Sequence, residues 1–515
     1  MNRRDFMKTL GLMGLMASGG ISVPAWARAA ALKPDFNLPV DLGALPYNKI
    51  QGVDKIPRVI TLFMQGGASE LAGNLSNMGD INMNSVNYYG DEFNPDAVNT
   101  VVTHNGLWRT AGGDIMEELL AAKQMSLYRT VHRRKENNRS HGPSVRQNLL
   151  GSLDSNSPGM ASTIAWLLMQ HATNGQGLFA GKALDELMFP FVTFDGENAL
   201  FNHGSLTLLP SLAPVALSER MQNPFTRSRN WAFSETEFAS LDTRLDALAS
   251  RVSASKKEVE KIHESLQRRG ENASSIARVF DAARINMGID ELNLLLPVDQ
   301  QIDYGNTGFG RRIKAAVSLM LNNEETLFAS LGSGGLGGWD DHSDGLLDYP
   351  VRMQQMMQGI RAGLRHIEAV KTFGIPRFDE NNNSLGRETI YHADNIIINA
   401  YGDFGRIVNL NGPADTGGGW DHGNNQNLYT FGGSNIRGAD ALGKIVGTTQ
   451  RIGQSKTNAQ YTAPTDGSYE FEPFSIASTV YGYFGVQNPQ QFNVEPVIIE
   501  SGSGAPANEW RAHPV

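Results

Sequence analysis

The sequence predicts an α/β fold built on a mainly parallel β-sheet, with helices between the strands and a helical insertion. Three observations lead to this prediction. Runs of β-branched and apolar residues alternate with longer stretches of helical periodicity. The chain has 515 residues, of which 40% are hydrophobic, enough for a large core. It also carries 55 glycines, a composition typical of a loop-rich α/β enzyme rather than a helical bundle.

The strands are expected where short apolar runs end in Gly-rich or polar turns. These runs are residues 57–64, 125–131, 326–331, 395–400 and 428–432. Helices are expected at residues 115–123 and 351–370, from about residue 143, and near 474–484. Long spacings between the strands favour parallel pairing. In such a sheet the functional site lies at the carboxyl ends of the strands.

Residues of about 215–290 differ in character from the rest of the chain. Apolar residues recur there at helical spacing, namely Leu241, Leu245, Leu248, Val252, Val259, Ile262 and Leu266. Charged residues fill many of the positions between them. We therefore expect two or three amphipathic helices inserted into the α/β domain, which pack as a cap or, alternatively, bind a partner.

The first 29 residues are interpreted as a twin-arginine (Tat) signal peptide. Arg3 and Arg4 precede Asp-Phe-Met-Lys, and a moderately apolar run follows up to Val23. Small residues around Trp26 offer cleavage sites. The apolar run is short for a bilayer span of about 20 residues. The expected partner is the Tat translocase, the expected location is periplasmic or secreted, and no stable membrane span is expected after cleavage.

Composition excludes several classes of function. The net charge is −9 and no dense basic tract is present, so nucleic acid is not an expected partner. The chain contains no cysteine, which excludes disulfides, thiolate chemistry and Cys-ligated zinc. Any metal must therefore be held by His, Asp, Glu, Asn or backbone oxygen atoms.

Two similar loops are the first candidates for such a metal site. Residues 337–344 read GGWDDHSD and residues 418–423 read GGWDHG. Asp340 with His342, and Asp421 with His422, offer carboxylate and imidazole ligands that suit a divalent metal. Alternatively, each pair is a solvated turn. Trp339 and Trp420 could stack on a glycan, although a Trp in a Gly-rich loop more often packs beneath it.

Asp403 and the Arg139-Ser140-His141 segment complete the candidate site. Asp403 follows the 395–400 strand, where a buried carboxylate needs a metal or an ion pair with Arg406. Ser140 stands at the start of a helix, where it either caps the helix or, beside a metal, acts as a nucleophile. Helix N-termini bind anions, and Arg139 adds positive charge there.

The motifs LFMQGGASELAGN, NRSHGPSVRQNLL, GGWDDHSD, YGDFGR and GGWDHGNNQNLYTFGGSNIRG, in this order, resemble domain-of-unknown-function family 1501. That family is placed in the alkaline phosphatase/sulfatase-like superfamily. The resemblance implies one doubly wound α/β domain over residues 30–515 with a metal site at the strand ends. The implied metal ligands are Asp340, His342, Asp403, Asp421 and His422. Ser140 would be the nucleophile. Apart from the resemblance, Arg139, which would hold the developing charge, and His141 are the other candidate catalytic residues.

Two functions from different classes follow from this pattern. The first is an exported hydrolase of phosphate or sulfate esters that uses a divalent metal ion, which could be zinc, manganese, calcium or magnesium. Its substrate would be a small anionic ester or a glycan. The second is a non-catalytic sulfatase-like binding or assembly protein of the cell envelope or secretion pathway. The sequence Gln65-Gly66-Gly67 favours the second, because metallophosphatases of the superfamily have a metal-binding Asp after this strand.

Overall fold

The fold is described from a computed structural model of the chain. It describes most of residues 53–217 and 282–489, together with short pieces near both ends. Gaps fall at residues 69, 77–100, 136–138 and 174–182 in the first block, and at 380, 415–416 and 453–459 in the second. The proposed signal peptide, residues 1–29, lies outside the described residues, as do residues 221–281 of the expected insertion.

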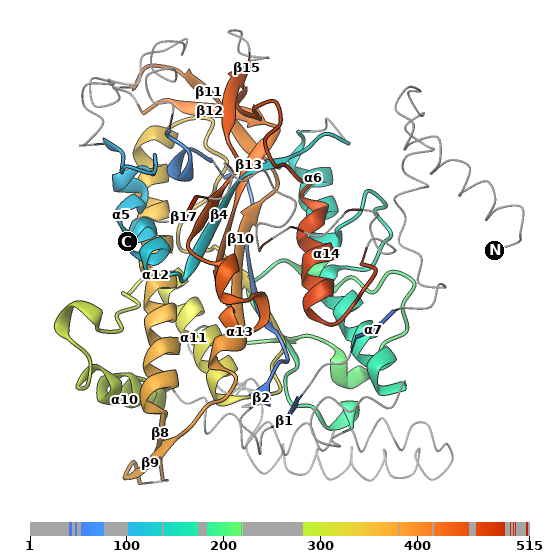
Figure 1. The fold of residues 1–515 in the computed structure, drawn as a ribbon, viewed down its shortest axis with the longest axis vertical. Coiled ribbons are helices and arrows are strands. Elements are labelled where there is room, and N and C mark those ends of the chain that lie inside the picture. The colour runs from blue at the N-terminus through green and yellow to red at the C-terminus, as the bar shows by residue number, and fades with distance from the viewer. Residues whose placement is uncertain are drawn as a thin grey trace, which may run out of the picture.

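A nine-stranded mixed sheet forms the centre of the molecule (Figure 1). Its strand order is β17-β14-β4-β13-β10-β3-β7-β5-β6. Strands β13 and β17 run antiparallel to their neighbours, and every other neighbouring pair in this sheet is parallel. The predicted α/β class with a mainly parallel sheet is therefore confirmed, whereas the specific alkaline phosphatase-like topology stays a prediction.

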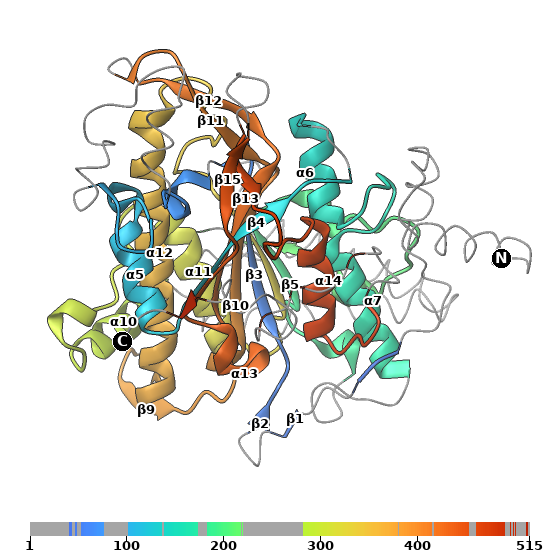
Figure 2. The same ribbon diagram turned by 45° about the horizontal axis from the view of Figure 1, so that its top comes forward.

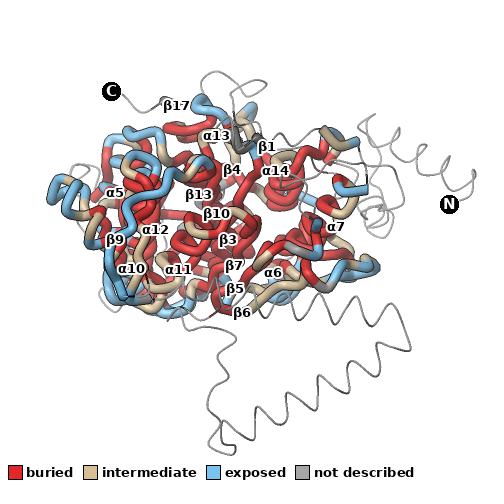
Figure 3. The backbone as a smooth tube through the Cα atoms, turned by 90° about the horizontal axis from the view of Figure 1, so that it is seen from below, coloured by how far each residue is buried: buried red, intermediate tan, exposed pale blue. Residues whose placement is uncertain are grey.

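The five predicted strands all form within this sheet. They are β3 (Arg58–Met64), β4 (Met125–His132), β7 (Phe328–Gly332), β10 (Ile396–Gly402) and β13 (Asn425–Gly432). The remaining strands of the sheet are β5 (Phe191–Phe194), β6 (Val215–Ala216), β14 (Lys444–Val446) and β17 (Arg511–Ala512). The central strands are buried along their whole length, which explains their nearly continuous apolar sequences (Figure 3).

Helices cover both faces of the sheet (Figure 2). One face carries α5 (Gly113–Ala121), α10 (Ala282–Asn293), α11 (Gly308–Asn322) and α12 (Gly345–Phe373). The other carries α6 (His141–Leu150), α7 (Met160–Thr173) and α14 (Phe474–Tyr483). The helices predicted near 115–123, 143, 351–370 and 474–484 correspond to α5, α6, α12 and α14.

Strand β3 divides the two hydrophobic cores. Ile60 and Leu62 point into the core with α5, α11 and α12, while Val59 and Phe63 point into the core with α7 and α14. This alternation follows from the two-residue repeat of a strand, which sends successive side chains to opposite faces. The result is a three-layer arrangement with the sheet in the middle.

Smaller elements surround the sheet. The two-stranded sheets comprise β1 (Tyr47–Asn48) with β2 (Val53–Asp54), β8 (Ile375–Phe378) with β9 (Ser384–Glu388), β11 (Gly405–Asn411) with β12 (Gly419–Gly423), and β15 (Thr449–Ile452) with β16 (Gln460–Pro464). The short helices are α13 (Ser434–Arg437), η2 (Glu70–Gly73), η5 (Arg109–Ala111), η6 (Leu184–Glu186), η7 (Asn198–Phe201), η8 (Pro210–Leu212), η9 (Val298–Gln300), η10 (Ala393–Asn395) and η12 (Ala439–Ala441).

Within the range expected to be inserted, residues 215–216 form edge strand β6 and residues 282–290 belong to α10. No helix in the described parts of the chain has the length and apolarity needed to cross a membrane.

Candidate metal centre

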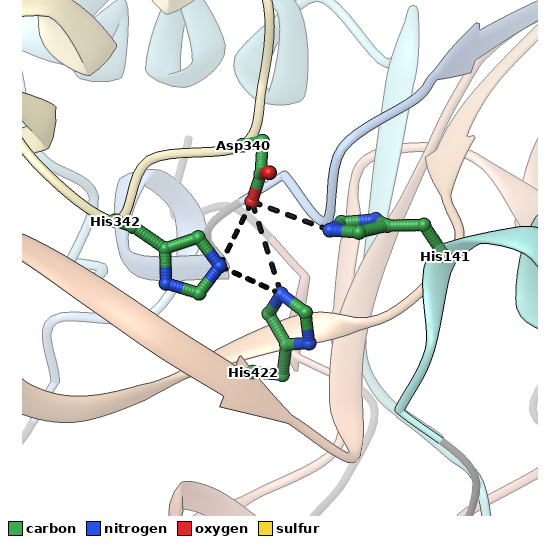
Figure 4. A group of neighbouring side chains, drawn as sticks. All are labelled: His141, Asp340, His342 and His422. Carbon is green, nitrogen blue, oxygen red and sulfur yellow. Dashed lines mark hydrogen bonds and ion pairs between the residues drawn. The ribbon is translucent and has the colours of Figure 1, made fainter.

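Four side chains from three separate segments of the chain meet at the carboxyl edge of the central strands. They are His141, Asp340, His342 and His422, and one ligand atom from each lies within 4.8 Å of the others (Figure 4). His141 begins α6 after β4, Asp340 and His342 follow β7, and His422 lies on β12. Because β3, β4, β7 and β10 run in the same direction, their carboxyl ends lie at one edge and bring these loops together.

The carboxylate of Asp340 is central to the group. Its Oδ1 lies 3.3 Å from Nε2 of His141 and 3.1 Å from Nε2 of His342. The Nε2 atom of His422 is 3.8 Å from the same oxygen. The four side chains are between 20% and 49% exposed. The cluster is therefore open to solvent and could hold a metal ion, because three imidazoles and one carboxylate can converge on one point.

Two of the histidines are oriented by partners on their far side. Nδ1 of His141 lies 2.7 Å from Oδ2 of Asp403, and Nδ1 of His422 lies 2.6 Å from the backbone oxygen of Arg139. Both partners are acceptors, so each Nδ1 donates and each Nε2 keeps its lone pair toward the cluster. Nδ1 of His342 is 3.8 Å from a carboxylate oxygen of Asp421, beyond hydrogen-bond distance.

A buried polar atom tests whether the cluster fits a metal ion. Nε2 of His141 is buried and makes no hydrogen bond with the described residues. Its 3.3 Å contact with Oδ1 of Asp340 is not a hydrogen bond, and a bound ion would give this buried nitrogen the partner that it lacks. The donor set and the orientation of the rings therefore both fit a metal.

The electrostatic surroundings differ from one member of the cluster to the next. The hydrogen bond that Nδ1 of His141 donates to Asp403 raises the pKa of His141 against the opposing effect of burial. Burial, followed by the charge of Arg406, lowers the pKa of His422. Burial tends to raise the pKa of Asp340, but the hydrogen bond and charge of Arg406 outweigh it and the pKa is lowered. Asp340 is thus held as an anion, the form that binds a metal.

Arg406 joins the loops that carry the cluster. Its buried guanidinium donates to the backbone oxygens of Gly67 (2.6 Å), Trp420 (2.9 Å) and Trp339 (3.0 Å). It also donates to Oδ1 of Asp340 at 2.8 Å. The planar group with five N–H donors can bond to several loops at once, which lysine could not do. The sequence left open an ion pair between Asp403 and Arg406. In the structure Arg406 forms its ion pair with Asp340.

The two Gly-Gly-Trp loops bond directly to each other. The N–H of Trp420 donates to the backbone oxygen of Asp341 at 2.6 Å, and Ser343 forms a β-bridge with Gly418. A Cβ on Gly419 would lie 2.2 Å from that same Asp341 oxygen, so only glycine allows this approach. The similarity of the loops therefore reflects two strands of chain that pair beside one site.

Both tryptophans pack beneath the loops. Trp339 and Trp420 are fully buried, and each contacts Tyr349 of α12 edge-to-face with ring centroids 6.1 Å and 6.0 Å apart. Such pairs stabilise a packed cluster by about 0.5–1.5 kcal/mol beyond area burial. Neither tryptophan offers a surface on which a sugar could stack.

The remaining predicted site residues lie around the cluster. Asp403 is fully buried; it accepts from His141 and from the backbone N–H of Gly67, and it stands behind the cluster rather than in it. Asp421 lies beside His342 and accepts from the N–H of His422 at 2.9 Å. Arg139 donates from its guanidinium to the backbone oxygen of His422 at 3.0 Å.

Ser140 occupies the N-cap position of α6, where it is exposed and makes no side-chain capping bond. His141, predicted as a catalytic residue, lies among the four candidate ligands, and its catalytic role stays a prediction. One signal could have revealed this: His141 follows a parallel strand within a few residues, as His342 does. The sequence also missed the pairing of Asp341, the neighbour of Asp340, with Arg352 of α12.

The fold and the cluster together define an α/β protein with a candidate metal centre at the carboxyl edge of its sheet. No family model and no curated protein matches the chain. The resemblance to family 1501 consequently stays a prediction.

Proposed function

We propose that this protein is an exported metal-dependent hydrolase of phosphate or sulfate esters. The observation that carries the proposal is the arrangement of ring nitrogens. The Nδ1 atoms of His141 and His422 both face acceptors, which directs their Nε2 atoms toward Asp340. This is the arrangement of carboxylate- and carbonyl-supported histidines in metal sites.

Among the divalent metals considered, zinc fits this donor set best. Magnesium and calcium prefer oxygen ligands, whereas three imidazoles and one carboxylate suit zinc. The carboxylate of Asp403 already accepts hydrogen bonds from His141 and from the N–H of Gly67, so it is not available to bind a second ion. We therefore expect one metal ion in the cluster. A bound zinc ion would supply a Lewis acid next to the ester oxygen.

The residues beside the cluster suit attack on an anionic ester. Ser140 is exposed and directly precedes His141 at the N-terminus of α6, where backbone N–H groups and the helix dipole favour an anion. We assign Ser140 as the nucleophile, with its neighbour Arg139 as a charge that stabilises the transition state. The likeness to family 1501 and the Tat-type N-terminus support export to the periplasm or the medium.

Metal analysis and an activity panel test this function together. The exported protein should contain about one zinc ion and should hydrolyse 4-nitrophenyl phosphate or 4-nitrocatechol sulfate. Ser140→Ala should abolish turnover and keep the metal, while Ser144→Ala, a buried serine on the same helix, is the matched control for fold. Protein without metal, or activity unchanged in Ser140→Ala, would contradict the proposal.

A non-catalytic envelope protein is the second candidate, and one observation favours it. The stretch Gln65-Gly66-Gly67, where the superfamily has its metal-binding Asp, offers no carboxylate, and Gly66 could not carry one, because a Cβ there would lie 2.5 Å from the backbone nitrogen of Asp340. In addition, four protein ligands can close a tetrahedral site, as in structural zinc centres. This candidate predicts bound zinc whose removal lowers the melting temperature, without hydrolysis of any ester in the panel.

A further inference from the structure

A further carboxyl group reaches the edge of the sheet that carries the metal centre. Strand β5 runs parallel to β7, and after Phe194 at its carboxyl end the chain continues to Glu197, the residue that precedes η7. Strand β7 leads in the same way into the loop with Asp340 and His342. Because parallel strands end at one edge of a sheet, Glu197 begins η7 at the edge where the candidate metal ligands converge.

Helix η7 lies on the same face of the sheet as α6. Its last residue, Phe201, packs edge-to-face against Phe328 of β7, with ring centroids 6.0 Å apart, in the core that also holds α7 and α14. Helix η7 also contacts α6, which begins at His141 and has Ser140 at its N-cap. Edge and face together therefore bring Glu197 to the part of the molecule that holds the proposed nucleophile.

The turn before Glu197 is held tightly against β7. Asp195 forms a β-bridge with Leu331. A Cβ on Gly196 would lie 2.5 Å from the backbone carbonyl carbon of Ser330, so only glycine allows this approach. The backbone of Glu197 is consequently fixed relative to the strand that leads to the metal ligands, as a group with a defined task at a site requires.

The carboxyl group of Glu197 has no cation beside it to hold it ionised. It is partly buried, and it makes no hydrogen bond or ion pair within the described part of the chain. Burial, followed by the charge of Asp403, raises its pKa. Asp403 is the carboxylate that accepts from His141 at 2.7 Å, so the charge that acts on Glu197 belongs to the metal centre. Glu197 therefore keeps its proton to a higher pH than an ordinary glutamic acid does.

A protonated carboxyl group supplies what the cluster lacks. The oxygen atom that leaves an ester of an alcohol is a strong base and needs a proton, whereas a nitrophenolate is stable without one. The cluster is poorly suited to give this proton, because Asp340 is held as an anion and the Nε2 atoms of His141 and His422 keep their lone pairs for a metal.

On the basis of the proposed hydrolase function, we propose that Glu197 is the general acid of this site and that its substrates are phosphate or sulfate esters of alcohols. In the first step the ionised oxygen of Ser140 bonds to phosphorus or sulfur, the bond to the leaving oxygen breaks, and Glu197 gives its proton to that oxygen. In the second step water attacks the ester on Ser140 and passes a proton to the carboxylate of Glu197. The Ser140 oxygen leaves with the electron pair of its bond, so both residues return to their initial states.

Two esters with similar rings separate this role from a structural one. Benzyl phosphate releases an alcohol and 4-nitrophenyl phosphate releases a stable phenolate; the matching sulfates serve if the exported protein prefers sulfate. In Glu197→Gln, kcat/KM for the benzyl ester should fall about 100-fold or more, whereas that for the nitrophenyl ester should change less than about 5-fold. Asp195→Asn, at an exposed carboxylate that pairs with Arg312 at 2.7 Å, is the matched control and should change neither value. Asparagine tolerates the left-handed backbone of this position, where φ is 54°.

The outcomes distinguish this role from the proposed function. Hydrolysis of neither ester by the unmodified protein would overturn both. Hydrolysis of the nitrophenyl ester alone would refute alcohol esters as the substrate class, and with them the need for an acid. If the unmodified protein hydrolyses both esters and Glu197→Gln loses both equally or neither, the general acid is refuted while the proposed function stands. Loss of zinc from Glu197→Gln would also refute it, because Glu197 would then hold the metal.

Discussion

The Nε2 atom of His342 lies 2.9 Å from the Nε2 atom of His422, although the two residues are 80 positions apart in the chain. The rings are tilted toward each other with centroids 4.7 Å apart. Because the Nδ1 proton of His422 goes to the oxygen of Arg139, the Nε2 atom of His422 is an acceptor. In this pair His342 is therefore the donor, and its Nε2 also faces Oδ1 of Asp340 at 3.1 Å. A metal ion bound in the cluster would take the place of the Nε2 proton of His342.

Removal of a ring nitrogen from this pair should remove the metal. His422→Ala deletes a candidate ligand and leaves Asp340 without one of its three imidazole neighbours. We expect the zinc content to fall from about one per chain to below about 0.1 after dialysis, measured by plasma emission spectrometry. His203→Ala, at an exposed histidine that is not a member of the cluster, should retain the metal. Full zinc occupancy in His422→Ala would argue against the site.

The carboxylate behind His141 should tune the affinity for the metal. Asp403→Asn keeps the size of the side chain but removes the charge that orients His141. Loss of such a partner typically weakens metal binding about 10- to 100-fold. Competition with a chelator of known zinc affinity measures this change. An unchanged affinity would mean that Asp403 has only a packing role.

The guanidinium of Arg406 should matter more for stability than a surface arginine does. Arg406→Met leaves carbonyl oxygens of three loops without their donor, which we expect to cost more than about 3 kcal/mol. Arg361→Met breaks a solvent-exposed pair with Glu118 and should cost less than about 1 kcal/mol. Urea unfolding of both variants provides the comparison, and similar costs would contradict the assigned role of Arg406.

Acidification should weaken the fold partly through His366. Burial lowers the pKa of this ring from 6.5 to about 4 in the folded protein. The folded state therefore binds fewer protons than the unfolded state, so stability is fully present above pH 6.5 and is lost as the pH falls toward 4. From pH 7 to 5 we expect a loss on the order of 1–2 kcal/mol.

Urea unfolding at the two pH values, with His366→Asn for comparison, tests this contribution. The variant should be less stable at pH 7, because the bond to Tyr304 changes. It should nevertheless show a shallower decrease between pH 7 and 5 than the unmodified protein. The same decrease in both proteins would exclude His366 as a source of the pH dependence.

Much of the fold could be predicted because burial determines which residues along a strand or helix must be apolar. A strand covered on both faces, such as residues 58–64, must be apolar nearly throughout, and a helix such as residues 345–373 repeats its apolar positions. The direction of β13 could not be predicted in this way, since the pattern of an apolar run is the same in either orientation. Pairing is decided by the neighbours across the sheet.

The sequence predicted the residue types of the candidate site and the edge of the sheet at which it lies. It did not predict the role of each residue. Asp and His in loops after parallel strands indicated a metal site by themselves. Only the folded chain decided that His141 lies with the cluster while Asp403 lies behind it, because this depends on side-chain positions within about 1 Å across segments more than 250 residues apart. The two tryptophans follow the same principle: local sequence marks the loops, whereas packing against Tyr349 decides that both rings are buried.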